Sequence, residues 1–204
     1  MSDFEPYFGK SLEVMPDLAK MLKNEFNILD LFKTAVENNW LTFFKLLVQD
    51  SDTKICIVNQ LHLAAETGQL KIVSFCTKIL DNTNPKRSYP EHQKQWNGRT
   101  PLHMAAQKGQ LRVVQHICNL LQDKNPSDDA GCTPFELAAS QGHLNIVSFY
   151  TEILDNPNPK RTFPENEKQF NGRTPLHVAA QFGQLSVVEH ICNLLQDKNP
   201  SDDN

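Results

Sequence analysis

The chain has 204 residues, of which 39% are hydrophobic and 22% are charged, and its formal net charge is −4. This length and composition allow a packed core, and the lysines and arginines are spread along the sequence rather than gathered into the basic face that phosphate neutralisation requires. No apolar stretch approaches the ~20 residues that cross a bilayer, and residues 1–10 lack the basic start and apolar run of a signal peptide. We therefore expect a cytoplasmic protein, with a nuclear location also open, that has no nucleic-acid or membrane partner.

The first 27 residues differ in pattern from the rest of the chain. SLEVMPDLAKMLKNEF (11–26) has helical spacing of apolar residues, which Pro16 interrupts. We expect residues 1–27 to form a helix that caps the first of the repeats described next. The alternative is a flexible tail that recruits another molecule.

From residue 28 onward the sequence repeats itself at two levels. NGRTPLHMAAQKGQ (97–110) returns as NGRTPLHVAAQFGQ (171–184), and the longer segments 97–129 and 171–203 differ at only four of 33 positions. The four differences are Met104/Val178, Lys108/Phe182, Arg112/Ser186 and Gln115/Glu189. Related copies are LHLAAETGQLKIV (61–73), FELAASQGHLNIV (135–147) and the degenerate LFKTAVENNWLTFFKLL (31–47). These copies predict five repeats, at approximately 28–57, 58–96, 97–129, 130–170 and 171–204.

Each repeat is predicted to contain two short helices. Thr100 before Pro101 predicts a helix start, because a threonine hydroxyl accepts a hydrogen bond from a free amide and proline suits the first helical position. Gly109 predicts the end of that helix, since glycine readily adopts the left-handed conformation found there. Other repeats carry the same signals at Thr133-Pro134, Thr174-Pro175, Gly68, Gly142 and Gly183, whereas Asn59-Gln60 keeps the cap without the proline.

The second helix of the 97–129 repeat is predicted to run from Leu111 to Leu121, with Asn125-Pro126 ending the helical stretch. Its wide apolar surface indicates burial on more than one side. The first helices carry paired alanines at 105/106, 138/139 and 179/180. We expect adjacent repeats to approach closely there, where a larger side chain would cost roughly 1–3 kcal/mol of overpacking.

The motif G-x-T-P-L-H-x-A-A-x-x-G at a 33-residue spacing resembles the ankyrin repeat, whose T-P-L-H-x-A signature is specific. The resemblance is strongest over 97–129 and 171–203, good over 58–96 and 130–170, and weak over 28–57. It implies an all-α repeat solenoid of stacked helix-turn-helix units with extended finger loops, forming one ankyrin repeat domain over residues 28–204. The chain ends SDDN where the equivalent stretch continues SDDAGCTPFELAA (127–139), and we interpret it as a fragment of a longer array.

Three stretches depart from the ankyrin pattern. Residues 133–136 read TPFE instead of TPLH, so the threonine–histidine hydrogen bond of the family cannot form there. Residues 55–58 read ICIV in place of the glycine turn, and we expect that finger to be distorted or strand-like. Eight extra residues lengthen the fingers at 81–96 and 155–170, whose proline and charge content predicts extended, solvent-facing loops.

No residue pattern in the chain predicts catalysis, a metal or a cofactor. His116 and Cys118 are two positions apart, as are His190 and Cys192, so on a helix the members of each pair point about 200° away from each other. The resemblance assigns a structural hydrogen-bonding role to the histidines of the T-P-L-H slot, His62, His103 and His177. The adjacent acids Asp128-Asp129 and Asp202-Asp203 lie in fingers and are expected to be solvated. The five cysteines, an odd number placed mostly in apolar helical stretches, are interpreted as reduced thiols.

In proteins that the chain resembles, partners contact the finger tips and the exposed end of each first helix. Carried over to this sequence, that surface comprises Trp96, Asn97, Arg99, Gln107, Lys108, Asp129, Cys132, Ser140, Gln141, Phe170, Arg173, Gln181 and Phe182. For Trp96 and Phe170 an equally weighted alternative is packing onto their own long fingers. The long fingers are basic and the short finger between them carries Asp123, Asp128 and Asp129, which predicts alternating basic and acidic bands suited to a partner with patterned charge.

Together these features predict a non-catalytic protein–protein interaction module or scaffold. We expect a monomer that binds a protein partner of unknown identity on the concave face and finger loops of the array. The alternative is the recognition arm of a larger enzyme or channel whose functional domain lies beyond residue 204. Nucleic-acid binding through the basic fingers is the least favoured hypothesis.

Overall fold

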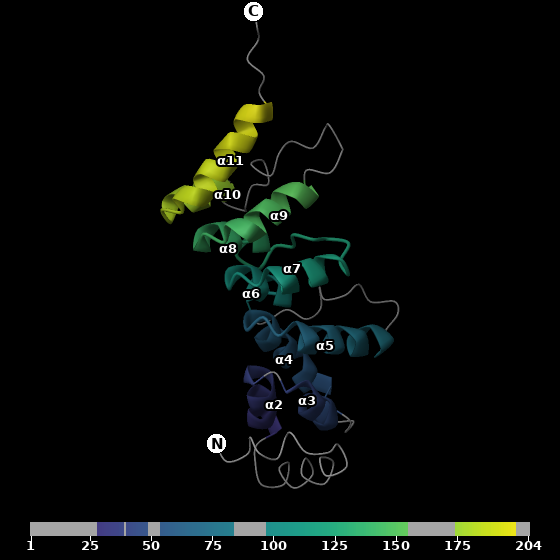
Figure 1. The fold of residues 1–204 in the computed structure, drawn as a ribbon. Coiled ribbons are helices and arrows are strands. Elements are labelled where there is room, and N and C mark those ends of the chain that lie inside the picture. Colours follow the sequence, from purple (N-terminus) through teal and green to yellow (C-terminus); the bar gives the residue numbers. More distant parts are fainter. Residues whose placement is uncertain (1–27, 39, 49–53, 84–96, 155–173, 199–204) are drawn as a thin grey trace, which may run out of the picture.

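The computed structural model describes residues 28–38, 40–48, 54–83, 97–154 and 174–198. Within these residues the chain forms ten α-helices in five consecutive pairs (Figure 1). They are α2 (Ile28–Glu37), α3 (Leu41–Val48), α4 (Lys54–Glu66), α5 (Leu70–Thr83), α6 (Pro101–Gln107), α7 (Leu111–Cys118), α8 (Pro134–Gln141), α9 (Leu144–Leu154), α10 (Pro175–Gln181) and α11 (Leu185–Lys198). The capping helix or tail at 1–27 and most of the two long fingers lie outside the described residues, so the expectations for them stay predictions.

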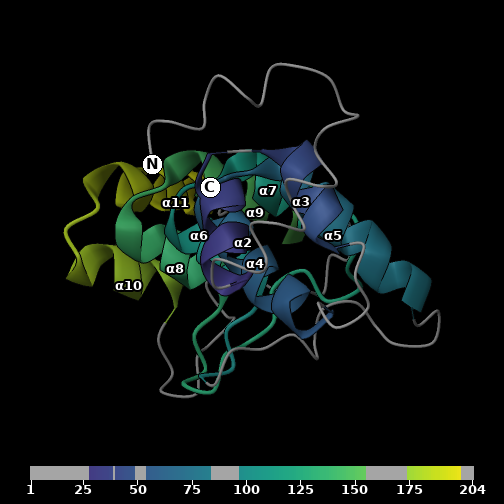
Figure 2. The same ribbon diagram turned by 90° about the horizontal axis from the view of Figure 1, so that it is seen from below.

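The five pairs stack on one another in chain order, from α2–α3 at one end to α10–α11 at the other (Figure 1). The first helices of the pairs (α2, α4, α6, α8 and α10) pack side by side in one layer, and the second helices pack in another (Figure 2). This arrangement confirms the predicted all-α repeat solenoid. None of the described helices is both long enough and apolar enough to cross a membrane.

Threonine and proline start the first helices as expected. Proline is the first residue of α6, α8 and α10, and Thr133 Oγ1 accepts a hydrogen bond from the Glu136 amide at 3.3 Å. In this TPFE repeat the Glu136 carboxylate accepts from the amide and the hydroxyl of Thr133, at 2.9 and 3.1 Å. Glutamate therefore takes the capping position that histidine holds in α6 and α10.

One continuous hydrophobic core runs along the stack between the two layers. The close approach expected at the paired alanines is confirmed, because five of the six have no exposed surface: Ala105, Ala106, Ala138, Ala139 and Ala179. The sixth, Ala180, is exposed. Aromatic rings also pack in the core, as where Phe135 and Tyr150 lie 5.4 Å apart between ring centroids.

The structure differs from the sequence prediction at residues 55–58. These residues lie inside α4, so the ICIV stretch is helical rather than strand-like, and Asn59 is an interior helix residue rather than a cap. The sequence from Lys54 to Gln60 contains no glycine or proline, so nothing in it stops the helix from extending toward its N-terminus. The helical conformation also places Ile57 in the core, where it is 1% exposed.

The end of the second helix was also predicted too late in one repeat. α7 ends at Cys118, three residues before Leu121, and bends lead from there into the finger. The identical sequence ICNLLQDK continues as helix to Lys198 in α11. Because the local sequence is the same, the difference comes from tertiary context, which overrides helix propensity. In the 97–129 repeat the residues after α7 form the finger that hydrogen-bonds to α6 and α8.

Candidate partner-binding surface

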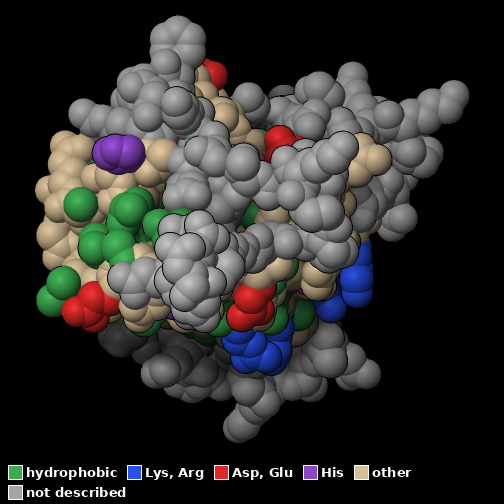
Figure 3. Space-filling model, turned by 90° about the horizontal axis from the view of Figure 1, so that it is seen from above, with side chains coloured by type: hydrophobic (Ala, Val, Ile, Leu, Met, Phe, Trp, Pro, Cys, Tyr) green, Lys and Arg blue, Asp and Glu red, His purple; other side chains and the backbone are tan. Residues whose placement is uncertain are grey.

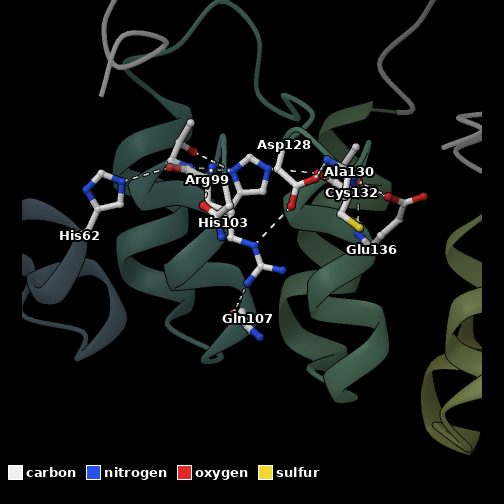
Figure 4. Close-up of polar contacts among 11 residues, drawn as sticks. His62, Arg99, His103, Gln107, Asp128, Ala130, Cys132 and Glu136 are labelled. Atoms are coloured by element: carbon white, nitrogen blue, oxygen red, sulfur yellow. Dashed lines mark hydrogen bonds and ion pairs between the residues drawn. The ribbon is translucent and has the colours of Figure 1, made fainter. Parts of the chain in front are cut away.

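Histidines join the finger of one repeat to the first helix of the repeat before it (Figure 4). His62 Nε2 lies 3.1 Å from the Arg99 carbonyl oxygen, and His103 Nε2 lies 3.1 Å from that of Cys132. In His103, Nδ1 accepts from the Thr100 amide at 3.1 Å, which places the ring proton on Nε2 and makes Nε2 the donor to Cys132. The structural role expected for these two histidines is confirmed.

Asp128 closes the finger between α7 and α8. Its Oδ1 accepts from the amides of Ala130 at 3.0 Å and Cys132 at 2.8 Å, and its Oδ2 accepts from Arg99 Nε at 3.2 Å (Figure 4). The Asp128 side chain is 3% exposed, so the prediction of a solvated acid is wrong at this position. The cause is the tight turn, whose amides need an acceptor that a short carboxylate can supply. Asp129 is exposed as expected, and Asp202-Asp203 lie outside the described residues.

Charged side chains pair with residues that are distant in the sequence. Arg99 pairs with Asp128 of the next finger and donates from Nη1 to Gln107 Oε1 at 3.2 Å. Lys108 Nζ lies 3.3 Å from Glu66 Oε1 of the preceding repeat. Arg99 and Asp128, which belong to the predicted basic and acidic bands, are thus paired with each other, whereas Asp123 and Asp129 are exposed. The other lysines and arginines of the long fingers lie outside the described residues, so the alternating bands stay a prediction.

A second set of bonds between repeats lies at the other end of the first helices. The residue that follows Gly109, Gly142 or Gly183 donates from its side chain to a backbone carbonyl of the preceding repeat. The three bonds are Gln110 Nε2 to Glu66 O at 3.3 Å, His143 Nε2 to Gln107 O at 3.0 Å, and Gln184 Nε2 to Ser140 O at 2.9 Å. Sequence reasoning missed these residues, although a glutamine or histidine after every such glycine was a visible signal.

The residue before each helix-ending glycine, or before its Asn39 equivalent, is exposed in all five repeats. We call this set the exposed row, and its members are Asn38, Thr67, Lys108, Gln141 and Phe182. Phe182 is 57% exposed, and it replaces a lysine at the equivalent position of the 97–129 repeat. The exposed row therefore presents one side chain per repeat at the turn end of the first helices.

Some of the other predicted contact residues are exposed, and others are partly or fully buried. Asn97, Arg99 and Gln107 are partly buried and take part in hydrogen bonds at the repeat junctions. Cys132 is partly buried, and Ser140 is buried and donates to the Leu137 carbonyl at 2.7 Å, so little of the Ser140 side chain is open to a partner. Lys108, Asp129, Gln141, Gln181 and Phe182 are exposed. Trp96, Phe170 and Arg173 lie outside the described residues.

His116 and Cys118 point to different neighbours, as the helical period predicts. The Cys118 thiol lies 3.8 Å from the Tyr150 hydroxyl of the following repeat. His116 lies within reach of the positive charge of Lys78 in the preceding repeat. Burial raises the pKa of the Cys118 thiol to about 11 and that of Cys76 to about 12, which disfavours the reactive thiolate. The described residues contain no group of three or more histidine, cysteine or acidic side chains that could hold a metal ion.

Burial, with a smaller contribution from Lys78, lowers the pKa of His116 below its ordinary value of 6.5. Its Nε2 is buried without a hydrogen-bond partner in the described part of the chain. As the pH falls below about 6.5, the unfolded chain takes up a proton at this position before the folded protein does, so stability is lost toward acid pH. Between about pH 7.5 and 5.5, we expect the urea concentration at the unfolding midpoint to fall less for His116→Gln than for the wild type. Parallel losses in the two proteins would show that His116 does not contribute.

Paired helices stacked in register, with side chains of each repeat bonded to the backbone of the next, define a repeat scaffold. A family model for ankyrin repeats in three copies matches residues 32–120, 61–152 and 117–202. The chain belongs to the ankyrin repeat family. A comparison with curated proteins finds no match. Ankyrin repeats generally act as protein–protein interaction modules and are typically non-catalytic.

Proposed function

We propose that this protein is a non-catalytic interaction module that binds a protein partner along its first helices, from the finger tips to the exposed row. The supporting observation is the exposed row itself, which offers one accessible side chain in each of five stacked repeats. The finger tips lie at the starts of the first helices and the exposed row at their ends. A partner that contacts both therefore crosses about 10 Å of helix, the length of a seven-residue helix such as α6.

The bonds between repeats prepare this surface for binding. Arg99 is held by Asp128 and Gln107, and Lys108 lies beside Glu66, so these long side chains have lost much of their freedom before a partner arrives. Binding to a preorganised surface costs less conformational entropy. Phe182 supplies an exposed aromatic ring of the kind that dominates binding energy in interfaces. Trp96, Phe170 and Arg173 belong to the proposal on the strength of the family resemblance alone.

Capture of partners from the source cell lysate, followed by titration of the captured protein, tests the proposal. A variant with Lys108→Ala, Gln141→Ala and Phe182→Ala is expected to bind the captured partner roughly a hundredfold more weakly. Each substitution removes about 1 kcal/mol of binding free energy, and the three losses add. The three side chains are exposed, so the helical circular dichroism signal should not change.

The matched control carries Arg112→Ala, Gln115→Ala and Ser186→Ala, three exposed residues on the second helices. We expect this control to capture the same proteins as the wild type. Equal loss in both variants, or no loss in the first, would contradict binding along the first helices.

A further inference from the structure

The two nearly identical repeats have different surroundings. α6 and α7 of the 97–129 repeat lie in the middle of the stack and are followed by α8 and α9 (Figure 1). α10 and α11 of the 171–203 repeat form the end of the described stack (Figure 1). Since only four of 33 residues differ, the first copy shows what a helix pair packed on this face covers in the second.

Three core residues of the second copy are as buried as their counterparts in the first. They are Ala179, Val187 and Ile191, and their counterparts are Ala105, Val113 and Ile117. Four other residues are buried in the first copy but not in the second. Counterparts of the buried residues Leu102, Ala106, Val114 and Cys118 become partly or fully exposed at Leu176, Ala180, Val188 and Cys192.

Leu185 is 67% exposed and adds to this apolar face. Hydrophobic side chains gather at this end of the molecule, at the left of the view in Figure 3. Contiguous exposed apolar surface is typical of sites where another molecule binds.

Two further features of the same face correspond to contacts that the first copy makes with its neighbour. His177 is fixed by Thr174, whose Oγ1 lies 2.8 Å from Nδ1 and whose amide donates to it at 3.3 Å. In His103 this orientation serves to donate from Nε2 to the Cys132 carbonyl of the next finger. His177 is exposed instead, and its Nε2 has no hydrogen-bond partner among the residues that the structure describes.

The helix-ending glycines show the second feature. A Cβ added to Gly109 would lie 2.8 Å from the His143 ring, because the next repeat fills the space above this glycine. A Cβ added to Gly183 would meet nothing within 4 Å. The face of α10 and α11 thus keeps an open space where the matching face of α6 holds the side chain of a neighbour.

We propose that the face formed by Leu176, His177, Ala180, Gly183, Leu185 and Val188 binds a partner that presents a helical hairpin with the chemistry of α8 and α9. Such a hairpin supplies a loop carbonyl to His177, as Cys132 does to His103. It places a donor side chain like that of His143 over Gly183, as His143 lies over Gly109. An aromatic residue like Tyr150 then covers Cys192, as it covers Cys118. None of these six residues belongs to the exposed row, so the inference does not rest on the function proposed above.

The His177 donor and the open space over Gly183 argue against a second copy of the same face as the occupant. A two-fold interface brings identical surfaces together. Two His177 Nε2 donors would then lack acceptors, and two open spaces over Gly183 would lack a side chain to fill them. A hairpin of the α8–α9 type satisfies both features, and burying unsatisfied donors costs free energy.

The chain provides its own probe for the test. Residues 126–129 and 200–203 both read PSDD, so a second copy of residues 130–154 joined after Asp203 reproduces the spacing found in the middle of the stack. We expect this extended protein to unfold at a higher temperature than the wild type. Alkylation of Cys192, followed by mass spectrometry, should slow about tenfold, since a docked population of about 90% leaves one molecule in ten open.

The control protein carries the same extension with Phe135→Asp and Tyr150→Asp in the added copy only, which keeps its length and removes its apolar face. Stabilisation and protection of Cys192 by the first extension and not by the control would support the proposal. Equal effects of the two extensions, or no effect of the first, would overturn it. Sedimentation of the unextended protein as a dimer that Leu185→Asp dissociates would also overturn it, because the occupant would then be a second copy.

Discussion

Replacing Asp128 with alanine is expected to lower the free energy of unfolding by about 3 kcal/mol, within the range for breaking a buried charged pair and leaving amides unsatisfied. The substitution removes the acceptor for the amides of Ala130 and Cys132 and the partner of Arg99 Nε. Because the Asp128 side chain is 3% exposed, water cannot easily replace these bonds. Urea unfolding followed by circular dichroism measures the loss.

The neighbouring acid provides the control for this experiment. Asp129 is exposed, and Asp129→Ala should change the free energy of unfolding by no more than about 0.5 kcal/mol. Asp128→Asn should fall between the two, because its side-chain oxygen still accepts from the two amides while the ion pair with Arg99 is lost. Losses of similar size for Asp128→Ala and Asp129→Ala would mean that the finger does not depend on the buried carboxylate.

Features that depend on a few adjacent residues were predictable from the sequence. The threonine caps, the leading prolines and the glycine stops act within one helical turn, and six of these signals illustrate the agreement, whereas the cap expected at Asn59 is wrong. The six are Thr133, Thr174, Pro101, Pro134, Gly109 and Gly142. The paired alanines were equally readable, because a repeat that stacks on itself must keep its contact positions small.

Features that depend on distant neighbours were not predictable in the same way. The exposure of Asp128 is decided by Arg99, 29 positions earlier, and by a turn whose geometry the sequence alone does not specify. The stretch NLLQDK is bent after α7 and helical within α11, so no local rule assigns both copies correctly. The repeat position of Ser140 predicts a place on the binding surface, but its hydroxyl donates to the Leu137 carbonyl and the residue is buried.

The candidate surface shows the same division. The exposed row follows from the position before the glycine stop, and Lys108, Gln141 and Phe182 were identified there from sequence. The pairing of Arg99 with Asp128 and of Lys108 with Glu66 needed the structure, because each pair joins residues that are distant in the sequence. This pairing bears on partner choice, since charges that are neutralised in pairs attract a highly charged partner less than unpaired charges would.

Two glycines with the same backbone conformation should respond differently to the same substitution. Gly109 and Gly183 have φ of 75° and 69°, so alanine at either position adopts a left-handed conformation that costs about 1–2 kcal/mol. At Gly109 the new methyl group also displaces the His143 ring and its bond to the Gln107 carbonyl, which adds roughly 1–3 kcal/mol of overpacking. We expect Gly109→Ala to lower the free energy of unfolding by about 3 kcal/mol and Gly183→Ala by about 1 kcal/mol.

Urea unfolding of the two variants side by side isolates the steric effect, because the backbone cost is common to both. Adding His143→Ala to Gly109→Ala should cost less than the sum of the separate losses, since the clash is then relieved. Equal losses at Gly109 and Gly183 would show that the neighbouring side chain yields without cost. In the protein extended by residues 130–154, Gly183→Ala should become as costly as Gly109→Ala, because the added hairpin brings a histidine into the open space. The cost of one methyl group thus reports whether a helix pair has docked on α10 and α11.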